Sequence, residues 1–130
     1  MSEENVEIVR RAFAFGQQGR GDPDEALADF DPGVVLTSVE GGPSQGRSAI
    51  RDNLERWNSA WAESEGTAEE FIDAGDRVFV SAHFRGRGRG SGIEVDARFY
   101  YVYTLRERRI VRVDEFSDRA AALEAAGLAG

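Results

Sequence analysis

Residues 93–117, IEVDARFYYVYTLRERRIVRVDEFS, predict two long β-strands, 93–106 and 110–117, joined by a short turn. A connection this short cannot cross over the sheet, so the two strands are expected to pair antiparallel. Side chains alternate between the two faces of a strand, and the first strand has one face that is nearly all apolar or aromatic. We expect this face to pack against helices and the mixed opposite face to meet solvent or a partner subunit. The expected inward residues are Val95, Ala97, Phe99, Tyr101, Tyr103 and Leu105.

The rest of the chain predicts helices and further strands around this hairpin. Apolar residues spaced three and four apart favour helices, and Asp22-Pro23 and Asp118 are typical helix starts. Helices gathered before strands with short connections favour an α+β fold, with helices on one face of an antiparallel sheet. The size suits one domain, 1–130. The expected elements are helices at 5–18, 23–30, 48–63 and 119–126, strands at 34–39, 67–74 and 77–85, and a loop at 40–46.

The composition restricts the chemistry that the chain can perform. The sequence has no cysteine and one histidine, His83, which excludes disulfides, thiolate catalysis and a multi-histidine metal centre within one chain. All 16 basic residues are arginine, so lysine Schiff-base chemistry is excluded as well. The net charge of −8 argues against binding to nucleic acid or to an anionic membrane. No apolar run approaches a membrane span, and the acidic N-terminus lacks the signal-peptide pattern. We therefore expect a soluble cytoplasmic protein with no metal or cofactor.

Segments over nearly the whole chain carry a family resemblance: ENVEIVRRAF (4–13), GRGD (19–22), DP (31–32), QGRSAI (45–50), EEFIDAGDRVFV (69–80), GRGRGSG (86–92), YTLRERRIVRV (103–113) and DRAAALEAAGL (118–128). They resemble the nuclear transport factor 2-like superfamily, in particular its SnoaL-like branch. The resemblance implies a cone, in which a strongly curved sheet wraps a long helix and leaves an apolar pocket at the open end. Members include isomerases, cyclases, epoxide hydrolases, dehydratases and non-catalytic binding proteins, so the fold does not select a reaction.

The resemblance also implies that Val113 and Glu115 of the second strand face inward. Glu115 would then lie in an apolar cavity beside Tyr101 and Tyr103, where burial disfavours the charged form of its carboxyl group and suits it to acid/base work. SnoaL-like cyclases have a His and an Asp as acid/base candidates on their last two strands, and the matching positions here look like Tyr101 and Glu115. A tyrosine does not readily shuttle protons near neutral pH, but it can donate a hydrogen bond to an oxyanion. The alternative is that Glu115 is a rim or surface carboxylate.

The aromatic residues on the inward surfaces favour a flat or hydrophobic ligand. We expect a small apolar or carbonyl-containing molecule, and cofactor-free isomerisation, cyclisation or dehydration with Glu115 and Tyr101 as catalytic residues. The alternative is a non-catalytic ligand-binding or dimeric association module of the same fold. The expected ligand-binding residues are Phe13, Trp57, Trp61, Phe99, Tyr103 and Val113.

The outer face of the sheet predicts an interface and an ion-pair ladder. Tyr100, Val102, Thr104 and Phe116 form a stripe more apolar than an exposed sheet face normally is, so we expect a homodimer through this convex face. His83 alternates with the inward set of its strand and is expected on the same outer face. The nearby arginines are expected to form an ion-pair ladder with the acidic residues of neighbouring strands.

Four other functions fit the sequence less well. Residues 41–48 match a phosphate-binding loop except that Arg47 replaces its lysine and Pro43 removes an N–H group; Arg47 leaves open an anion at the start of the third helix. The Arg-Gly run at 86–92 is too short and too closely flanked by strands for an RNA-binding tract. The first strand lacks the carboxylate base of ketosteroid isomerases. Asp96, Arg98 and Asp114 have the residue types of an epoxide hydrolase centre, but the alternation places them on the convex face.

Overall fold

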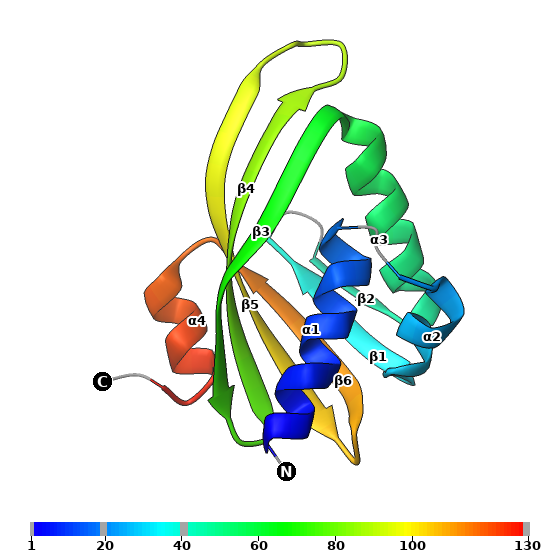
Figure 1. Ribbon diagram of the computed structural model, residues 1–130, viewed down its shortest axis with the longest axis vertical. Helices are drawn as coiled ribbons and strands as arrows, with labels where there is room; N and C mark the ends of the chain where they lie inside the picture. The colour runs from blue at the N-terminus through cyan, green and yellow to red at the C-terminus, as the bar shows by residue number, and fades with distance from the viewer. Residues whose placement is uncertain (1, 19–20, 40–41, 129–130) are drawn as a thin grey trace.

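The computed structural model describes residues 2–18, 21–39 and 42–128. Six strands form a single sheet, and the N-terminal helices pack on one of its faces while the C-terminal helix lies on the other (Figure 1). This is the mixed α+β arrangement with a curved sheet that the sequence predicts. The helices are α1 (Ser2–Gln18), α2 (Pro23–Ala28), α3 (Arg47–Ala60) and α4 (Arg119–Ala125); the strands are β1 (Phe30–Ser38), β2 (Gly42–Gln45), β3 (Trp61–Ala74), β4 (Arg77–Gly88), β5 (Glu94–Arg106) and β6 (Arg109–Phe116).

The strand order is β2-β1-β6-β5-β4-β3. The four C-terminal strands form the expected antiparallel meander, and β2 pairs antiparallel with β1. The β1–β6 pair is parallel, which corrects the expectation of an antiparallel sheet at this one place. The pair joins the N-terminal and C-terminal halves of the chain, so the concave face is built from both.

The register confirms which face of β5 packs inward. Tyr101 lies opposite Glu115 and Tyr103 lies opposite Val113 across the β5–β6 pair, so all four side chains share one face. Tyr101, Tyr103 and Val113 are only 5%, 2% and 4% exposed. They belong to the main hydrophobic core together with apolar residues of α1, α3 and the other strands. Burial of this face against the helices supplies the main driving force for folding.

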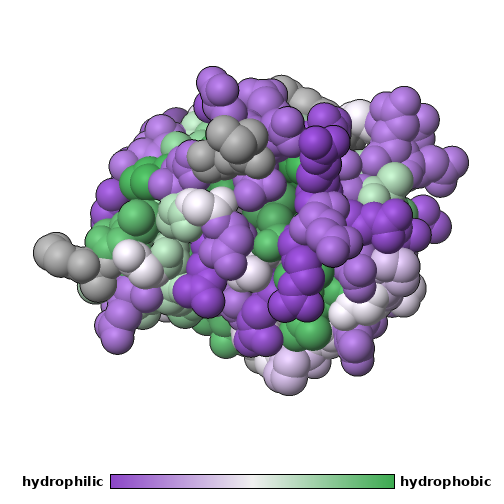
Figure 2. Space-filling view, turned by 90° about the horizontal axis from the view of Figure 1, so that it is seen from below, coloured by the Kyte–Doolittle hydropathy of each residue, from purple (hydrophilic) through white to green (hydrophobic). Residues whose placement is uncertain are grey.

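The outer face is partly covered by the chain itself. Val102 and Phe79 form a second hydrophobic cluster with Ala122 and Ala126, at α4, and Val102 is 1% exposed. Asp118 caps α4 by accepting a hydrogen bond from the N–H of Ala121, as the sequence predicts. Part of the stripe that we expected to meet solvent or a partner is therefore covered by α4. Seen from below, the surface is mostly hydrophilic, and apolar atoms gather on the side of α4 and the C-terminus (Figure 2).

Several element boundaries differ from the sequence prediction. Helix α3 starts after Gly46 rather than at Ser48 and ends at Ala60 rather than at Glu63, and Trp61 is the first residue of a strand that begins well before Thr67. Residues 42–45, expected as loop, form β2. The early end of α3 has a cause outside the helix: the backbone N–H and the guanidinium of Arg89 donate hydrogen bonds to carbonyl oxygens at the end of α3. These contacts satisfy groups that a helix C-terminus leaves unpaired.

Candidate functional site

The concave face brings Tyr101 and Glu115 together. They occupy directly opposite positions on β5 and β6. The Oε1 atom of half-buried Glu115 accepts a hydrogen bond of 3.0 Å from the backbone N–H of Val39, at the end of β1. This contact joins residues 76 positions apart in the chain and holds the carboxylate from a second strand.

Aromatic side chains pack around this pair. The ring of Phe13, from α1, lies 6.0 Å from the ring of Tyr101 and 6.1 Å from that of Phe71, both edge to face. The rings of Tyr101 and Tyr103 are 6.3 Å apart. Edge-to-face pairs at these distances add to the stability gained by burial. The phenols are therefore fixed in orientation by the core itself.

The electrostatics of the site keep both phenols neutral. Burial raises the pKa of Tyr101 well above its usual value, and the charge of Glu115, the neighbouring Tyr103 and a hydrogen bond to Glu115 raise it further. Burial also raises the pKa of Tyr103, and the charge of Glu115 adds to the effect. A neutral phenol keeps its proton and acts as a hydrogen-bond donor rather than as an acid.

A second aromatic group lies beside the first. Trp57 contacts Phe84 and Trp61 at ring distances of 4.9 and 5.4 Å, and Phe99 at 6.0 Å. Trp57, Trp61 and Phe99 are half-buried, so part of each ring reaches the surface. Gly86 makes room for this packing, since a Cβ atom there would lie 2.9 Å from the Trp61 ring. The Nε1 atom of Trp61 is buried and has no hydrogen-bond partner among the described residues.

The predicted site residues thus fall into two adjoining groups. The structure places Phe13, Tyr101, Tyr103, Val113 and Glu115 in one group, and Trp57, Trp61 and Phe99 in the other. Phe71, Phe84 and the N–H group of Val39 were not among the expected site residues, although strand alternation predicts that Phe84 faces inward. The Val39 contact depends on a pairing between distant strands that leaves no local signal.

Hollows elsewhere on the molecule are lined by other residues. Three of them, of about 500, 560 and 200 Å³, include none of the predicted site residues. The hollow of about 500 Å³ lies between charged residues of β3, β4 and β5. Among the described residues there is no cluster of three side chains suited to hold a metal ion. Within the same part of the chain, no helix is long and apolar enough to cross a membrane.

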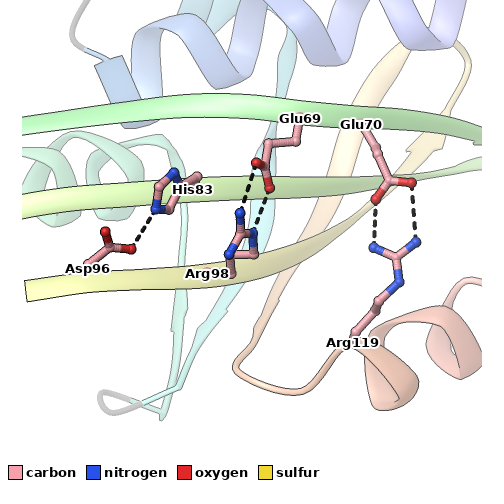
Figure 3. Close-up of polar contacts among 6 residues, drawn as sticks. All are labelled: Glu69, Glu70, His83, Asp96, Arg98 and Arg119. Carbon is pink, nitrogen blue, oxygen red and sulfur yellow. Dashed lines mark hydrogen bonds and ion pairs between the residues drawn. The ribbon is translucent and has the colours of Figure 1, made fainter.

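The outer face carries an ion-pair ladder, as expected, although Glu69 and Glu70 were not among the acidic residues predicted to form it. Arg98 bonds to Glu69 at 2.9 Å, Arg119 bonds to Glu70 at 2.6 Å, and His83 contacts Asp96 (Figure 3). Arg112 pairs separately with Asp114.

The three candidate residues for an epoxide hydrolase centre are therefore engaged in separate pairs on the convex side. Arg47, the candidate for an anion site, donates from Nε to the carbonyl oxygen of Phe30 at 2.9 Å. The candidates for an epoxide hydrolase centre and the candidate for an anion site thus all contact other groups of the protein.

Comparison with known proteins places the chain in a family. The model of the SnoaL-like domain family matches residues 9–113, and the chain belongs to this family. No functionally curated protein matches the chain.

Solved structures share the fold at low sequence identity. A putative SnoaL-like polyketide cyclase from Jannaschia sp. CCS1 is 24% identical, with 99% of this chain and 94% of that one covered and a TM-score of 0.78. TerC, co-crystallised with polyporic acid, is 22% identical over 95% and 98% of the two chains, with a TM-score of 0.74. A protein with a ketosteroid isomerase-like fold from Catenulispora acidiphila, in complex with trimethylamine, is 20% identical over 94% and 93%, with a TM-score of 0.71.

Proposed function

We propose that the concave face binds a small, largely apolar molecule and that Glu115 and Tyr101 carry out acid/base chemistry on a carbonyl compound. The observation that carries this proposal is the direct cross-strand pairing of the Glu115 carboxylate with a buried phenol. Isomerisation, cyclisation and dehydration are the reaction types that such a pair serves without a cofactor.

The two residues would have complementary roles. The phenol of Tyr101 is hydrogen-bonded to Glu115. A ligand carbonyl oxygen would replace Glu115 as the acceptor for the phenol, so the same event would polarise the carbonyl and release the carboxylate. Glu115 would then remove a proton from the carbon next to the carbonyl, and the phenol would stabilise the enolate oxygen. Tyr103 would supply a second neutral donor nearby.

The relatives support a small-molecule ligand. Two solved structures of this fold hold small molecules, polyporic acid in TerC and trimethylamine in the Catenulispora protein. Another is described as a putative polyketide cyclase. At these identities the likeness shows the fold alone, so the place and the chemistry of a ligand are argued from this chain.

The test is proton exchange on a panel of small ketones in deuterated buffer, followed by nuclear magnetic resonance (NMR). We expect exchange at the carbon next to the carbonyl, reduced about 100-fold or more by Glu115→Gln, since a positioned base contributes about 10²–10⁴-fold. Tyr101→Phe should reduce it less. Glu124→Gln, at an exposed position on α4, is the matched control. Exchange by Glu115→Gln at the parent rate would show that Glu115 is not the base.

A non-catalytic binding module is the second candidate. The observation that favours it is the close packing of the aromatic residues around Tyr101, which resembles a core more than an open cavity. Ligand binding by the parent without exchange on any ketone would favour this candidate.

We also propose a homodimer through the part of the convex face that α4 leaves uncovered. Tyr100 and Phe116 pack against the cluster at α4 but stay half-buried, and they lie opposite each other across β5 and β6. Light scattering at micromolar concentration should give twice the chain mass, and a monomer throughout would contradict the proposal.

A further inference from the structure

Glu115 is the single charged side chain that the described register places on the concave faces of β4, β5 and β6. Its neighbours on these faces are aliphatic and aromatic residues of the core. The ion pairs found among the described residues all involve other carboxylates. Two described arginines approach the interior, and both have other partners: half-buried Arg47 donates to the carbonyl oxygen of Phe30, and Arg10 lies 4.5 Å from the centre of the Phe71 ring. Glu115 therefore carries a negative charge that no side-chain cation in this part of the chain balances.

The half-buried carboxylate of Glu115 is partly removed from water without an ion-pair partner among the described residues. It loses part of its hydration, and hydrogen bonds from the N–H of Val39 and the phenol of Tyr101 replace some of that hydration. Its field reaches the neighbouring groups, since the charge of Glu115 raises the pKa of both Tyr101 and Tyr103. The same field stabilises any positive charge brought to the concave face. The net charge of −8 also attracts positively charged molecules over a longer range.

Aromatic rings with exposed area lie next to this carboxylate. Phe99 precedes Tyr101 by two residues, so it shares the concave face and is the diagonal neighbour of Glu115, about 7–8 Å away at the backbone. The ring of Trp57 lies 6.0 Å from that of Phe99, and both side chains are half-buried. Ring faces attract cations within about 6 Å. The aromatic and acidic groups thus favour the same kind of ligand.

We propose that the ligand of this site is an organic cation, with an amine or ammonium group paired to Glu115 and an apolar body lying on Phe99 and Trp57. This inference rests on the proposed function, because it specifies the substrate class of the same concave face. It specifies the kind of small molecule that the face binds. A carboxylate paired with an ammonium group is not free to act as a base, so the inference deepens the binding role of the face and not the proton transfer.

The test compares three probes of the same skeleton: 2-phenylethylammonium, neutral 2-phenylethanol and anionic 3-phenylpropionate. Quenching of tryptophan fluorescence reports binding, because the chain has two tryptophans, Trp57 and Trp61, and both belong to the second aromatic group. We expect the ammonium to bind about 10-fold or more tightly than the alcohol at low salt, with the anion weakest. Added salt should weaken the binding of the ammonium and leave the binding of the alcohol unchanged.

Variants separate this site from general attraction to an acidic protein. Glu115→Gln should remove the preference for the ammonium and keep the affinity for the alcohol, whereas Glu124→Gln should change neither. If Glu115→Gln does not fold, the parent still tests the preference, because equal binding of the ammonium and the alcohol would contradict it. Equal or tighter binding of the alcohol by the parent would overturn the cation proposal and leave the proposed small-molecule function standing. Failure of all three probes to bind would count against both.

Discussion

At the scale of single residues, the two buried phenols have the most strongly shifted pKa values among the described residues. Tyr101 and Tyr103 are removed from water and face the charge of Glu115. Both conditions oppose formation of a phenolate. The same conditions that make these tyrosines poor acids make them dependable donors, which is the property the proposed reaction needs.

This perturbation predicts a loss of stability in alkali. A phenol whose pKa is raised in the folded state contributes stability that is fully present below its unfolded value, near 10.0, and is lost as the pH rises further. We expect the free energy of unfolding to fall above pH 10. The free energy of unfolding of Tyr103→Phe should fall less steeply with pH, because this variant lacks one of the two phenols. Urea titrations from pH 8 to pH 11 measure the slope; equal slopes for parent and variant would contradict the assignment.

At the scale of elements, the junction of α3 and β3 depends on Arg89. Its Nε and Nη2 atoms donate to the carbonyl oxygens of Ser59 and Trp61, at 3.1 and 3.0 Å, and its backbone N–H donates to Ala60. The guanidinium also lies where the helix dipole favours a cation. An arginine of the β4–β5 loop therefore fixes where α3 stops and where Trp61 turns into the sheet.

Replacing this arginine should destabilise the junction. We expect Arg89→Ala to lower the free energy of unfolding by about 1–2 kcal/mol, the sum of its hydrogen bonds and dipole interaction. Arg87→Ala, near the end of β4, is the control, since it removes only an exposed ion pair with Glu63, worth about 0–1 kcal/mol. Urea denaturation compares them, and a loss no larger for Arg89 than for Arg87 would refute this role.

The same junction shows where prediction from sequence stops. The apolar spacing at Ile50, Leu54, Trp57 and Trp61 continues the helix to Glu63, because periodicity contains no signal for a cap supplied by a distant loop. Local alternation was enough to predict the inward face of Tyr101, but both faces of the next strand are mixed, so the inward position of Glu115 was predicted from the family resemblance. The N–H donor from Val39 comes from a parallel pairing of distant strands, which neither feature encodes.

At the scale of the whole molecule, ion pairs tie the strands of the outer face to each other and to α4. Hydrogen bonds from Arg98, Arg119 and His83 lower the pKa of Glu69, Glu70 and Asp96, respectively. All these pairs are exposed to solvent, so each is worth little alone. Together they place a set of ionised carboxylates across the outer surface.

These lowered values predict sensitivity to acid. A carboxyl group whose pKa is depressed by folding contributes stability that is present above its unfolded value, about 4.5 for glutamate, and is lost as the pH falls through the folded value. We expect the free energy of unfolding to decrease between pH 5 and pH 3. Glu70→Gln should make that decrease shallower, and Glu124→Gln should not. Identical profiles for Glu70→Gln and the parent would contradict the prediction.

The parallel pairing of β1 with β6 has a consequence for biosynthesis. β1 is translated early, but its neighbour in the middle of the sheet is the last strand to leave the ribosome. Until then the nascent chain exposes an open strand edge, which is a template for aggregation, and contacts of such long sequence separation form slowly. We expect chains interrupted before Arg109 to lack both the Glu115 carboxylate and the strand that shields β1. Such chains should therefore depend on chaperones to stay unaggregated.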